Sequence, residues 1–262
     1  MNINNLLKED FYSLSGEDEK AIVEHLASRL KIEFEKKDKS GIYGLTQYRF
    51  AYNSNHIEGS TLTENQTREL FQNGTIHSDE EVFVAKDIEE GTGHFMMFNE
   101  MLATYEEELT QELIKKYHFR LKSGVWEDMA NGYPCGEYKN RINRVSDIAV
   151  VHPLEVEGEM RRLLDWYNTE EKTLKTIGVF HACYERIHPF QDGNGRTGRM
   201  ILFKESLKNG IVPAIVNEED RNIYMQSLHL AQTEKDYEEL VDFLKKKQAD
   251  YYKNIRDFLW EY

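Results

Sequence analysis

Residues 188–199, with the sequence HPFQDGNGRTGR, combine groups that could perform phosphate chemistry. His188 can act as a general base towards a hydroxyl group, because an imidazole loses its proton near neutral pH. Asp192 supplies a carboxylate of the kind that binds a hard divalent cation such as Mg²⁺. Arg196 and Arg199 are three positions apart, so in a helix they are neighbours that can reach successive phosphate groups. These residue types together favour phosphoryl or nucleotidyl transfer.

Gly193 and Gly195 indicate how this stretch could hold phosphates. We expect a helix before it, a loop from His188 to Gly193, and a second helix that begins at residues 194–197. The first turn of a helix has unpaired backbone N–H groups and the positive end of the helix dipole, and glycine lets an anion approach them. A Walker loop would need Gly-Lys-Ser/Thr, and a dinucleotide fingerprint would need a preceding strand. A different phosphate cradle is therefore predicted, although His-Pro or Gly-Asn-Gly alone would usually be a structural turn.

Helical periodicity dominates the chain on both sides of this loop. Apolar residues recur at helical spacing in residues 18–31, 95–105, 113–121, 155–168, 172–187, 197–209, 219–232 and 236–259. Capping-box spacing at Thr63 and Ser78 marks two helix starts. Only residues 139–151, KNRINRVSDIAVV, look extended, around a Ser-Asp turn. The predicted fold class is all-α with one small β-hairpin.

The composition excludes several classes of protein. A chain of 262 residues, 40% of them hydrophobic, can bury a sizeable core and is not disordered. A net charge of −14 argues against nonspecific binding to nucleic acid or anionic membranes. The chain has no apolar run of 20 residues and no signal-peptide pattern at its start. Cys135 and Cys183 are too few for a disulfide framework, so we expect reduced thiols in the cytoplasm.

The stretch HPFQDGNGRTGR resembles the signature of the Fic-domain family, His-x-Phe-x-Asp/Glu-Gly-Asn-Gly-Arg-x-x-Arg, and fills each of its fixed positions. Members of that family are mostly helical and typically move AMP from ATP onto a hydroxyl group of a target protein. The resemblance implies a Fic-like helical domain with a small β-hairpin flap beside the active site. It also implies that His188 deprotonates a Ser, Thr or Tyr hydroxyl of the target.

The resemblance assigns the remaining residues of the loop to the nucleotide. Asp192 would bind Mg²⁺ or Mn²⁺, and Asn194 would hold the α-phosphate together with the amides of Gly193 and Gly195. Arg196 would bind the β-phosphate. The arginine three positions later, Arg199, would bind the γ-phosphate. Relatives that phosphorylate their targets depart from the pattern near Gly195, so its presence here favours nucleotidyl transfer.

Two further segments resemble parts of the family. The sequences ELIKKYHFRLKSG and PCGEYKNR are similar to a family helix and to the lead-in of the flap, although Lys139 stands where an arginine is common. The flap would hold a target segment by strand pairing. The residues expected to dock the target are Arg141, Ile142, Asn143, Arg144 and Val145. Tyr224, in DRNIYMQSL, resembles a residue that lines the adenine pocket, and a core position is the alternative.

A second motif lies upstream of the core. SNHIEG, residues 54–59, resembles the family's inhibitory pattern Ser/Thr-x-x-x-Glu-Gly/Asn. Ser54 and Glu58 are four positions apart on one helix face, and Gly59 is expected to end that helix. The resemblance names Arg199 as the partner of Glu58, and this pairing would remove the γ-phosphate contact. Spacing alone would favour a solvated Glu58, but an intact catalytic loop in the same chain favours inhibition.

The resulting organisation has three parts. Residues 1–89 form an N-terminal helical segment with the inhibitory motif, residues 90–245 form the Fic core domain, and residues 246–262 form the end of a C-terminal helix. The expected partners are ATP and a target protein, not nucleic acid or a membrane; self-modification and a homo-oligomer stay open. Two other functions also stay open. Glu58 could position a water molecule that removes AMP from a modified protein, or the chain could be a nucleotide-sensing binding module, against which the intact His188 argues.

Overall fold

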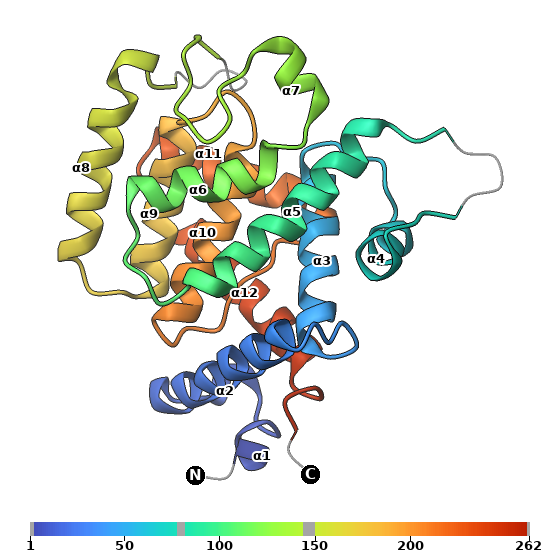
Figure 1. Ribbon diagram of the computed structural model, residues 1–262. Helices are drawn as coiled ribbons and strands as arrows, with labels where there is room; N and C mark the ends of the chain where they lie inside the picture. The colour runs from blue at the N-terminus through green and yellow to red at the C-terminus, as the bar shows by residue number, and fades with distance from the viewer. Residues whose placement is uncertain (1–2, 78–81, 144–149, 261–262) are drawn as a thin grey trace.

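Helices account for most of the chain (Figure 1). The computed structural model describes residues 3–77, 82–143 and 150–260. The α-helices in these ranges are α1 (Ile3–Leu6), α2 (Gly16–Glu35), α3 (Ile42–Ile57), α4 (Glu64–Asn73), α5 (Ala85–Thr104), α6 (Gln111–Lys122), α7 (Trp126–Asn131), α8 (Val156–Thr169), α9 (Leu174–Ile187), α10 (Asn194–Lys208), α11 (Arg221–Thr233) and α12 (Glu238–Ile255). Short 3-10 turns are η1 (Phe11–Ser13), η2 (Pro153–Glu155) and η3 (Glu218–Asp220). The all-α class predicted from the sequence is confirmed.

Helix α10 lies at the centre of the bundle and contacts α2, α3, α5, α6 and α9 (Figure 1). Nearly all of its side chains from Asn194 to Leu207 are buried, polar ones included. A helix that is covered on all sides must satisfy its polar groups within the core. Lys204 and Glu205 pair at 2.6 Å, and Glu205 also accepts a hydrogen bond of 2.7 Å from the Tyr167 hydroxyl. The position of the loop that precedes α10 is therefore set by several helices at once.

The ends of several helices follow the local signals in the sequence. The Thr63 hydroxyl accepts a hydrogen bond from the Gln66 backbone N–H, and the Gln66 side chain accepts one from the Thr63 backbone N–H. This capping box begins α4, as predicted. Helix α6 ends at Lys122, with Ser123 as its C-cap, one residue beyond the predicted helical pattern of residues 113–121. The capping box predicted at Ser78 lies outside the described residues.

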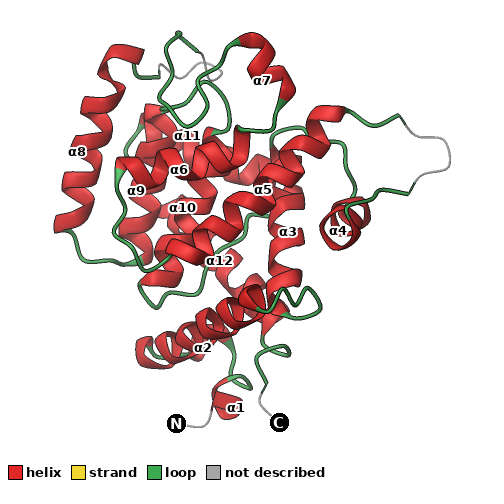
Figure 2. Cartoon of the chain, in the orientation of Figure 1, coloured by secondary structure: helices red, strands yellow, loops and turns green. Residues whose placement is uncertain are grey.

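The predicted β-hairpin is not found, because the described residues contain no strand (Figure 2). The lead-in of residues 139–143 bonds to the loop before α10. The Lys139 N–H donates to the Pro189 carbonyl at 2.9 Å, and the Asn143 amide donates to the Phe190 carbonyl at 3.0 Å. The rest of the expected hairpin, with Arg144 and Val145, lies outside the described residues.

One buried apolar cluster extends from Leu6 to Leu259. Residues from the N-terminal helices, from the central helices and from α12 all contribute to it. The segments 1–89 and 246–262 thus pack on the same core as residues 90–245. None of the helices in the described ranges is long and apolar enough to cross a membrane.

Helices α5 and α6 approach each other closely at Gly93. A Cβ atom added to Gly93 would overlap the carbonyl oxygen of Leu121, which belongs to the backbone of α6 and cannot turn aside. We expect Gly93→Ala to lower the free energy of unfolding by about 2–3 kcal/mol, because the two backbones must separate. Gly158→Ala is the matched control: Gly158 is also helical, the nearest atoms are the end of the Arg162 side chain at 3.9 Å, and a gain of about 0.5–1 kcal/mol is expected. Urea unfolding of both variants measures the difference, and equal stabilities would contradict the close packing.

Candidate active site

His188 stands at the junction of α9 and the loop that leads to α10. It is the C-cap of α9, with a left-handed φ of 52°, and its Nδ1 lies 3.3 Å from the Glu185 carbonyl oxygen. Because a carbonyl can only accept, Nδ1 carries the proton and Nε2 keeps its lone pair. Burial, followed by the positive charge of Lys139, lowers the pKa of His188 to about 4. The imidazole is therefore neutral at pH 7, in the form that a general base needs.

Phe190 and Asn194 hold the loop closed. Phe190 is fully buried, and its ring stacks on the His118 ring with centroids 3.8 Å apart. His118 also bonds through Nε2 to the Asp192 carbonyl at 3.0 Å, and its Nδ1 accepts the Gly136 N–H at 2.9 Å. The Asn194 side chain accepts from the Phe190 N–H at 2.8 Å and donates to the Phe190 carbonyl at 2.9 Å. Both ends of the Asn194 amide are thus engaged within the loop, whereas the sequence prediction gave this side chain to the α-phosphate.

The backbone at the start of α10 offers a second element that could bind an anion. Gly193, with a φ of 79°, is the N-cap of α10, and the first turn of α10 begins with Asn194, Gly195 and Arg196. The N–H groups of a first turn have no helical carbonyl before them, and they point outwards at the positive end of the helix. This arrangement can bind an anion such as a phosphate group.

Asp192 lies among positive side chains. Its Oδ2 is 2.7 Å from Lys122 Nζ, 3.5 Å from Arg196 Nη2 and 4.0 Å from Lys86 Nζ. Burial opposes ionisation of this carboxyl, but Arg196 and Lys122 outweigh it and hold the pKa of Asp192 well below its usual range. Asp192 is therefore a carboxylate at any physiological pH.

Asp192 is the one carboxylate that the sequence analysis proposes as a ligand for a divalent cation. Within the described ranges, no group of three or more His, Cys, Asp or Glu side chains could hold a metal. The Asp192 side chain keeps 37% of its surface exposed, so part of it can still face a ligand. Mg²⁺ commonly takes one or two carboxylates and completes its shell with phosphate oxygens and water. Asp192 fits a metal ion that arrives with a nucleotide.

Arg196 is buried and already engaged on three sides. Its Nη1 contacts the Glu90 carboxylate and lies 3.3 Å from the Asn55 side-chain oxygen, while Nη2 faces Asp192. Its Nε has no hydrogen-bond partner among the residues that the structure describes. Burial opposes the charge, but Glu90 and Asp192 raise the pKa of Arg196, so the guanidinium stays protonated. Arg196 can therefore present a fixed positive charge beside Asp192.

Arg199 is held by α3. Its Nη2 lies 2.7 Å from Glu58 Oε1 and donates to the Ser54 carbonyl at 2.8 Å, and its Nε donates to the Ser54 hydroxyl at 3.0 Å. Helix α3 ends at Ile57, so Glu58 is its C-cap and lies one residue beyond the helix. Gly59 follows with a φ of 101°. The sequence-predicted pair of Glu58 and Arg199 is therefore in contact.

The Glu58 carboxylate also reaches the first turn of α10. A Cβ atom added to Gly195 would overlap Glu58 Oε1 and would lie 3.0 Å from Arg199 Nη1. The space left open by the absence of a side chain at Gly195 is thus filled by a carboxylate. That position borders the N–H groups of the first turn.

The fold and this site can be compared with known proteins. Residues 108–205 match the model of the Fic/DOC family, which includes the whole loop and most of α10. The chain contains a Fic domain.

Curated relatives carry the same domain in longer proteins. The protein adenylyltransferase fic-1 of Caenorhabditis elegans is 26% identical over 191 residues, which cover 71% of this chain and 37% of that protein. The protein adenylyltransferase Fic of Nematostella vectensis is 25% identical over 190 residues, which cover 70% of this chain and 43% of that protein. This chain therefore spans less than half the length of these relatives.

Solved structures share the fold of the Fic domain. A Fic domain containing signaling protein from Bacteroides thetaiotaomicron matches with a TM-score of 0.73 and 23% identity, over 89% of this chain and 96% of that one. Fic-1 from Caenorhabditis elegans matches with a TM-score of 0.67 and 22% identity, over 90% of this chain and 71% of that one. At these identities the likeness concerns the arrangement of the helices.

Four residues around the Fic loop were missed by sequence reasoning. They are Asn55, Glu90, His118 and Lys122. Each meets the loop or its arginines from a helix that is distant along the chain. Asn55 lies within the inhibitory motif, between its fixed positions, and His118 and Lys122 lie in the segment ELIKKYHFRLKSG that resembles a family helix, so their places in these segments were the available signals. Glu90 lies in an ordinary amphipathic helix, where no spacing sets it apart.

Tyr224 occupies a core position beside Arg199. Its side chain is fully buried, its hydroxyl lies 2.7 Å from His181 Nε2, and its ring centroid is 6.0 Å from Arg199 Cζ. Burial raises the pKa of Tyr224, and it lowers the pKa of His181 to about 3, so both side chains are neutral. The contact with Arg199 places Tyr224 beside an arginine of the loop region, and its role towards adenine stays a prediction.

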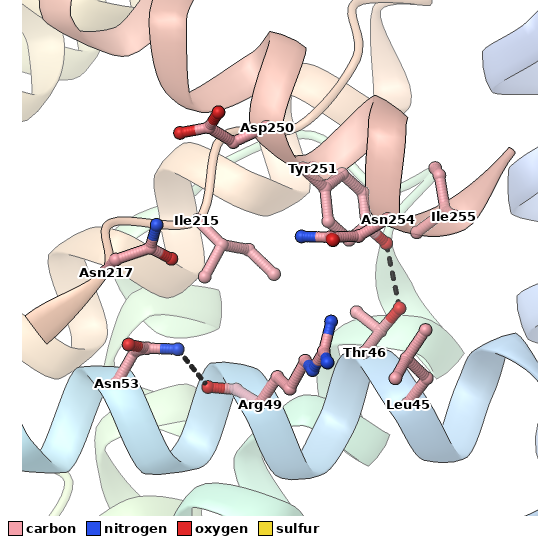
Figure 3. A pocket seen from close by; sticks show the side chains of 10 residues that line it. All are labelled: Leu45, Thr46, Arg49, Asn53, Ile215, Asn217, Asp250, Tyr251, Asn254 and Ile255. Carbon is pink, nitrogen blue, oxygen red and sulfur yellow. Dashed lines mark hydrogen bonds between the residues drawn. The ribbon is translucent and has the colours of Figure 1, made fainter.

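Helix α3 also contacts α12, at a place that includes none of the residues of the Fic loop (Figure 3). A small pocket lies between the two helices, and the Thr46 hydroxyl meets the Tyr251 hydroxyl at 2.9 Å at its edge. Asn53 turns its amide back to the Arg49 carbonyl at 2.9 Å. No residue predicted for catalysis lines this pocket. Its contacts bear on the position of α3, which presents Ser54 and Glu58 to Arg199.

Proposed function

We propose that this chain is a protein adenylyltransferase, which moves AMP from ATP onto a Ser, Thr or Tyr hydroxyl of a target protein. The observation that carries the proposal is the loop between α9 and α10. It places a neutral imidazole, a carboxylate and the open N-terminus of α10 within six residues, with two buried arginines on the following turns. The names of the curated relatives support the same activity.

The reaction follows from these positions. Nε2 of His188 takes the proton of the target hydroxyl, and the oxygen attacks the α-phosphorus. The bond from the α-phosphorus to the oxygen that bridges to the β-phosphate breaks, and pyrophosphate leaves. The N–H groups at the start of α10 stabilise charge on the α-phosphate, while Arg196 and Arg199 bind the β- and γ-phosphates. Mg²⁺ or Mn²⁺ held by Asp192 would neutralise charge on the leaving pyrophosphate.

We further propose that α3 restrains this activity. Arg199 gives its Nη2 to Glu58 and Ser54, so it cannot grip a γ-phosphate while that contact lasts. Asn55 adds a contact to Arg196, so one short segment occupies both arginines. A carboxylate oxygen that already accepts from Nη2 of Arg199 competes directly with a phosphate oxygen for that donor.

Residues 141–143 are proposed to meet the target protein. Ile142 is 71% exposed, a large apolar side chain next to Asn143, which bonds to the loop. Arg141 rests over the Tyr133 ring at 5.7 Å. An exposed apolar residue beside the catalytic loop can dock a segment whose hydroxyl must reach His188. Arg144 and Val145 belong to the same proposal from the sequence.

The test uses two labels. Glu58→Gly protein is incubated with protein extract and with ATP labelled in either the α- or the γ-phosphate. We expect protein-bound label from α-labelled ATP alone, because AMP keeps the α-phosphate and pyrophosphate carries the γ-phosphate away. Label from γ-labelled ATP would indicate phosphorylation instead, and absence of both would contradict transfer.

A further inference from the structure

Lys122 is a buried cation directly behind the Fic loop. Its side chain is 1% exposed at the end of α6, and its stem packs on the loop, where a Cβ added to Gly193 would lie 3.3 Å from Lys122 Cδ. Its ammonium group lies 2.5 Å from Glu90 of α5, 2.7 Å from Asp128 of α7 and 2.7 Å from Asp192. An ammonium group has three N–H donors, and each has its own carboxylate here. Three separate helices and the loop thus converge on one charge.

The cluster is close to electrically balanced without a metal ion. Its carboxylates are Glu90, Asp128 and Asp192, and its buried cations are Lys122 and Arg196, so it lacks one positive charge. A divalent cation on Asp192 would take it past neutrality by one charge. The phosphates of a nucleotide would restore the balance. Each of the two ligands, the metal ion and the nucleotide, should therefore raise the affinity for the other. The charge of Lys122 determines how large this effect is.

We propose that Lys122 is a positioning residue that serves as a built-in counter-cation for Asp192. The proposal rests on the function proposed above. Lys122 holds the carboxylate from its buried side and leaves the exposed side to the ligand. Because its charge lies next to the metal position, it weakens binding of a metal ion alone. The same charge favours binding of a nucleotide before any metal is present.

The test measures two affinities that should move in opposite directions. Mn²⁺ is titrated into the nucleotide-free protein and followed by electron paramagnetic resonance, and ADP is titrated in EDTA and followed by calorimetry. In Lys122→Met we expect Mn²⁺ to bind about tenfold more tightly and metal-free ADP about tenfold more weakly, since a unit charge a few ångströms from each ligand is removed in a partly buried site. Lost folding would weaken both, so opposite shifts identify the charge itself.

Asp128→Asn gives a second reading with little change in shape. The substitution removes one of the negative charges that offset the charge of Lys122. The net positive potential at Asp192 therefore increases, and Mn²⁺ should bind about threefold more weakly. Lys86→Met is the control: Lys86 lies 4.0 Å from Asp192 but is 35% exposed and pairs with Glu127, so shifts should stay below about twofold. If Lys122→Met does not fold, Lys122→Gln, which also removes the charge but keeps a polar side chain, is titrated in the same way, with the same opposite shifts expected.

The outcomes separate this proposal from the function beneath it. Mn²⁺ affinity that is unchanged or weaker in Lys122→Met, or unchanged or stronger in Asp128→Asn, would overturn the counter-cation role. A wild type that binds Mn²⁺ but never ADP would contradict the proposed transferase. The changes in Mn²⁺ affinity in the variants would still test the role of Lys122.

Discussion

Replacing Glu58 with glycine is expected to raise the rate of AMP transfer by on the order of 100-fold, the equivalent of about 3 kcal/mol, because a charged contact that competes for the buried Arg199 guanidinium is lost. The change removes the carboxylate that lies 2.7 Å from Arg199 and leaves the two contacts of Arg199 with Ser54. The guanidinium then has a free face for the γ-phosphate. The measurement is the initial rate of label transfer from α-labelled ATP to protein, for wild type and variant at equal concentration.

Two comparisons make that result specific. Glu64→Gly removes a surface carboxylate that pairs with Arg49 at 3.2 Å, and its transfer rate should match the wild type. In Glu58→Gly the affinity should rise for both nucleotides, because the space above Gly195 is cleared, and it should rise more for ATP, which alone has the γ-phosphate that Arg199 would bind. If Glu58→Gly transferred no faster than wild type, the restraint would be refuted. Release of AMP from a modified protein would then be assayed, because the same carboxylate could position a water molecule.

Replacing His188 with alanine in the Glu58→Gly protein should lower transfer by roughly 10²–10⁴-fold, the usual contribution of a general base. Nucleotide binding should change little, because the imidazole faces the hydroxyl and the arginines hold the phosphates. His229→Ala, an exposed position on α11, is the matched histidine control and should keep the full rate. A His188→Ala protein with at least a tenth of the parent rate would rule out His188 as the base.

The pH dependence of kcat/KM gives an independent check on His188. The neutral form is the active one, and burial lowers the pKa of His188 to about 4. The rate should therefore stay level from pH 8 down to about 5 and fall as the pH drops through about 4. An acidic limb near pH 6.5 would show an exposed imidazole instead. Circular dichroism at each pH separates this limb from acid unfolding.

The catalytic loop could be predicted because its information is contiguous. His188, Asp192 and the two arginines lie within twelve residues, and the glycines beside them mark a backbone that an anion can approach. The capping box that begins α4 at Thr63 was equally local. In these places a short stretch of chain determines both the backbone and the chemistry.

Long-range partners could not be predicted in the same way. Lys122 reads as the last residue of an amphipathic helix, and its three carboxylates come from α5, from α7 and from the loop. The extended pattern of residues 139–151 around a Ser-Asp turn suggested a hairpin, but such a pattern does not say which part of the fold the segment contacts. In the described part, the Asn143 side chain bonds to the Phe190 carbonyl. Asn194 was assigned to a phosphate by its place in the motif, whereas both ends of its amide close the loop.

The space above Gly195 has a consequence for how activity would depend on ATP. The Glu58 carboxylate fills that space and touches Arg199, so on the proposed function it and the nucleotide compete for the same positive surface. The carboxylate is tethered, and its effective concentration is fixed by how α3 is held, through Tyr251 of α12 among other contacts. Anything that loosens α3 would lower the concentration of ATP needed for half-maximal activity, with no change in the catalytic residues themselves.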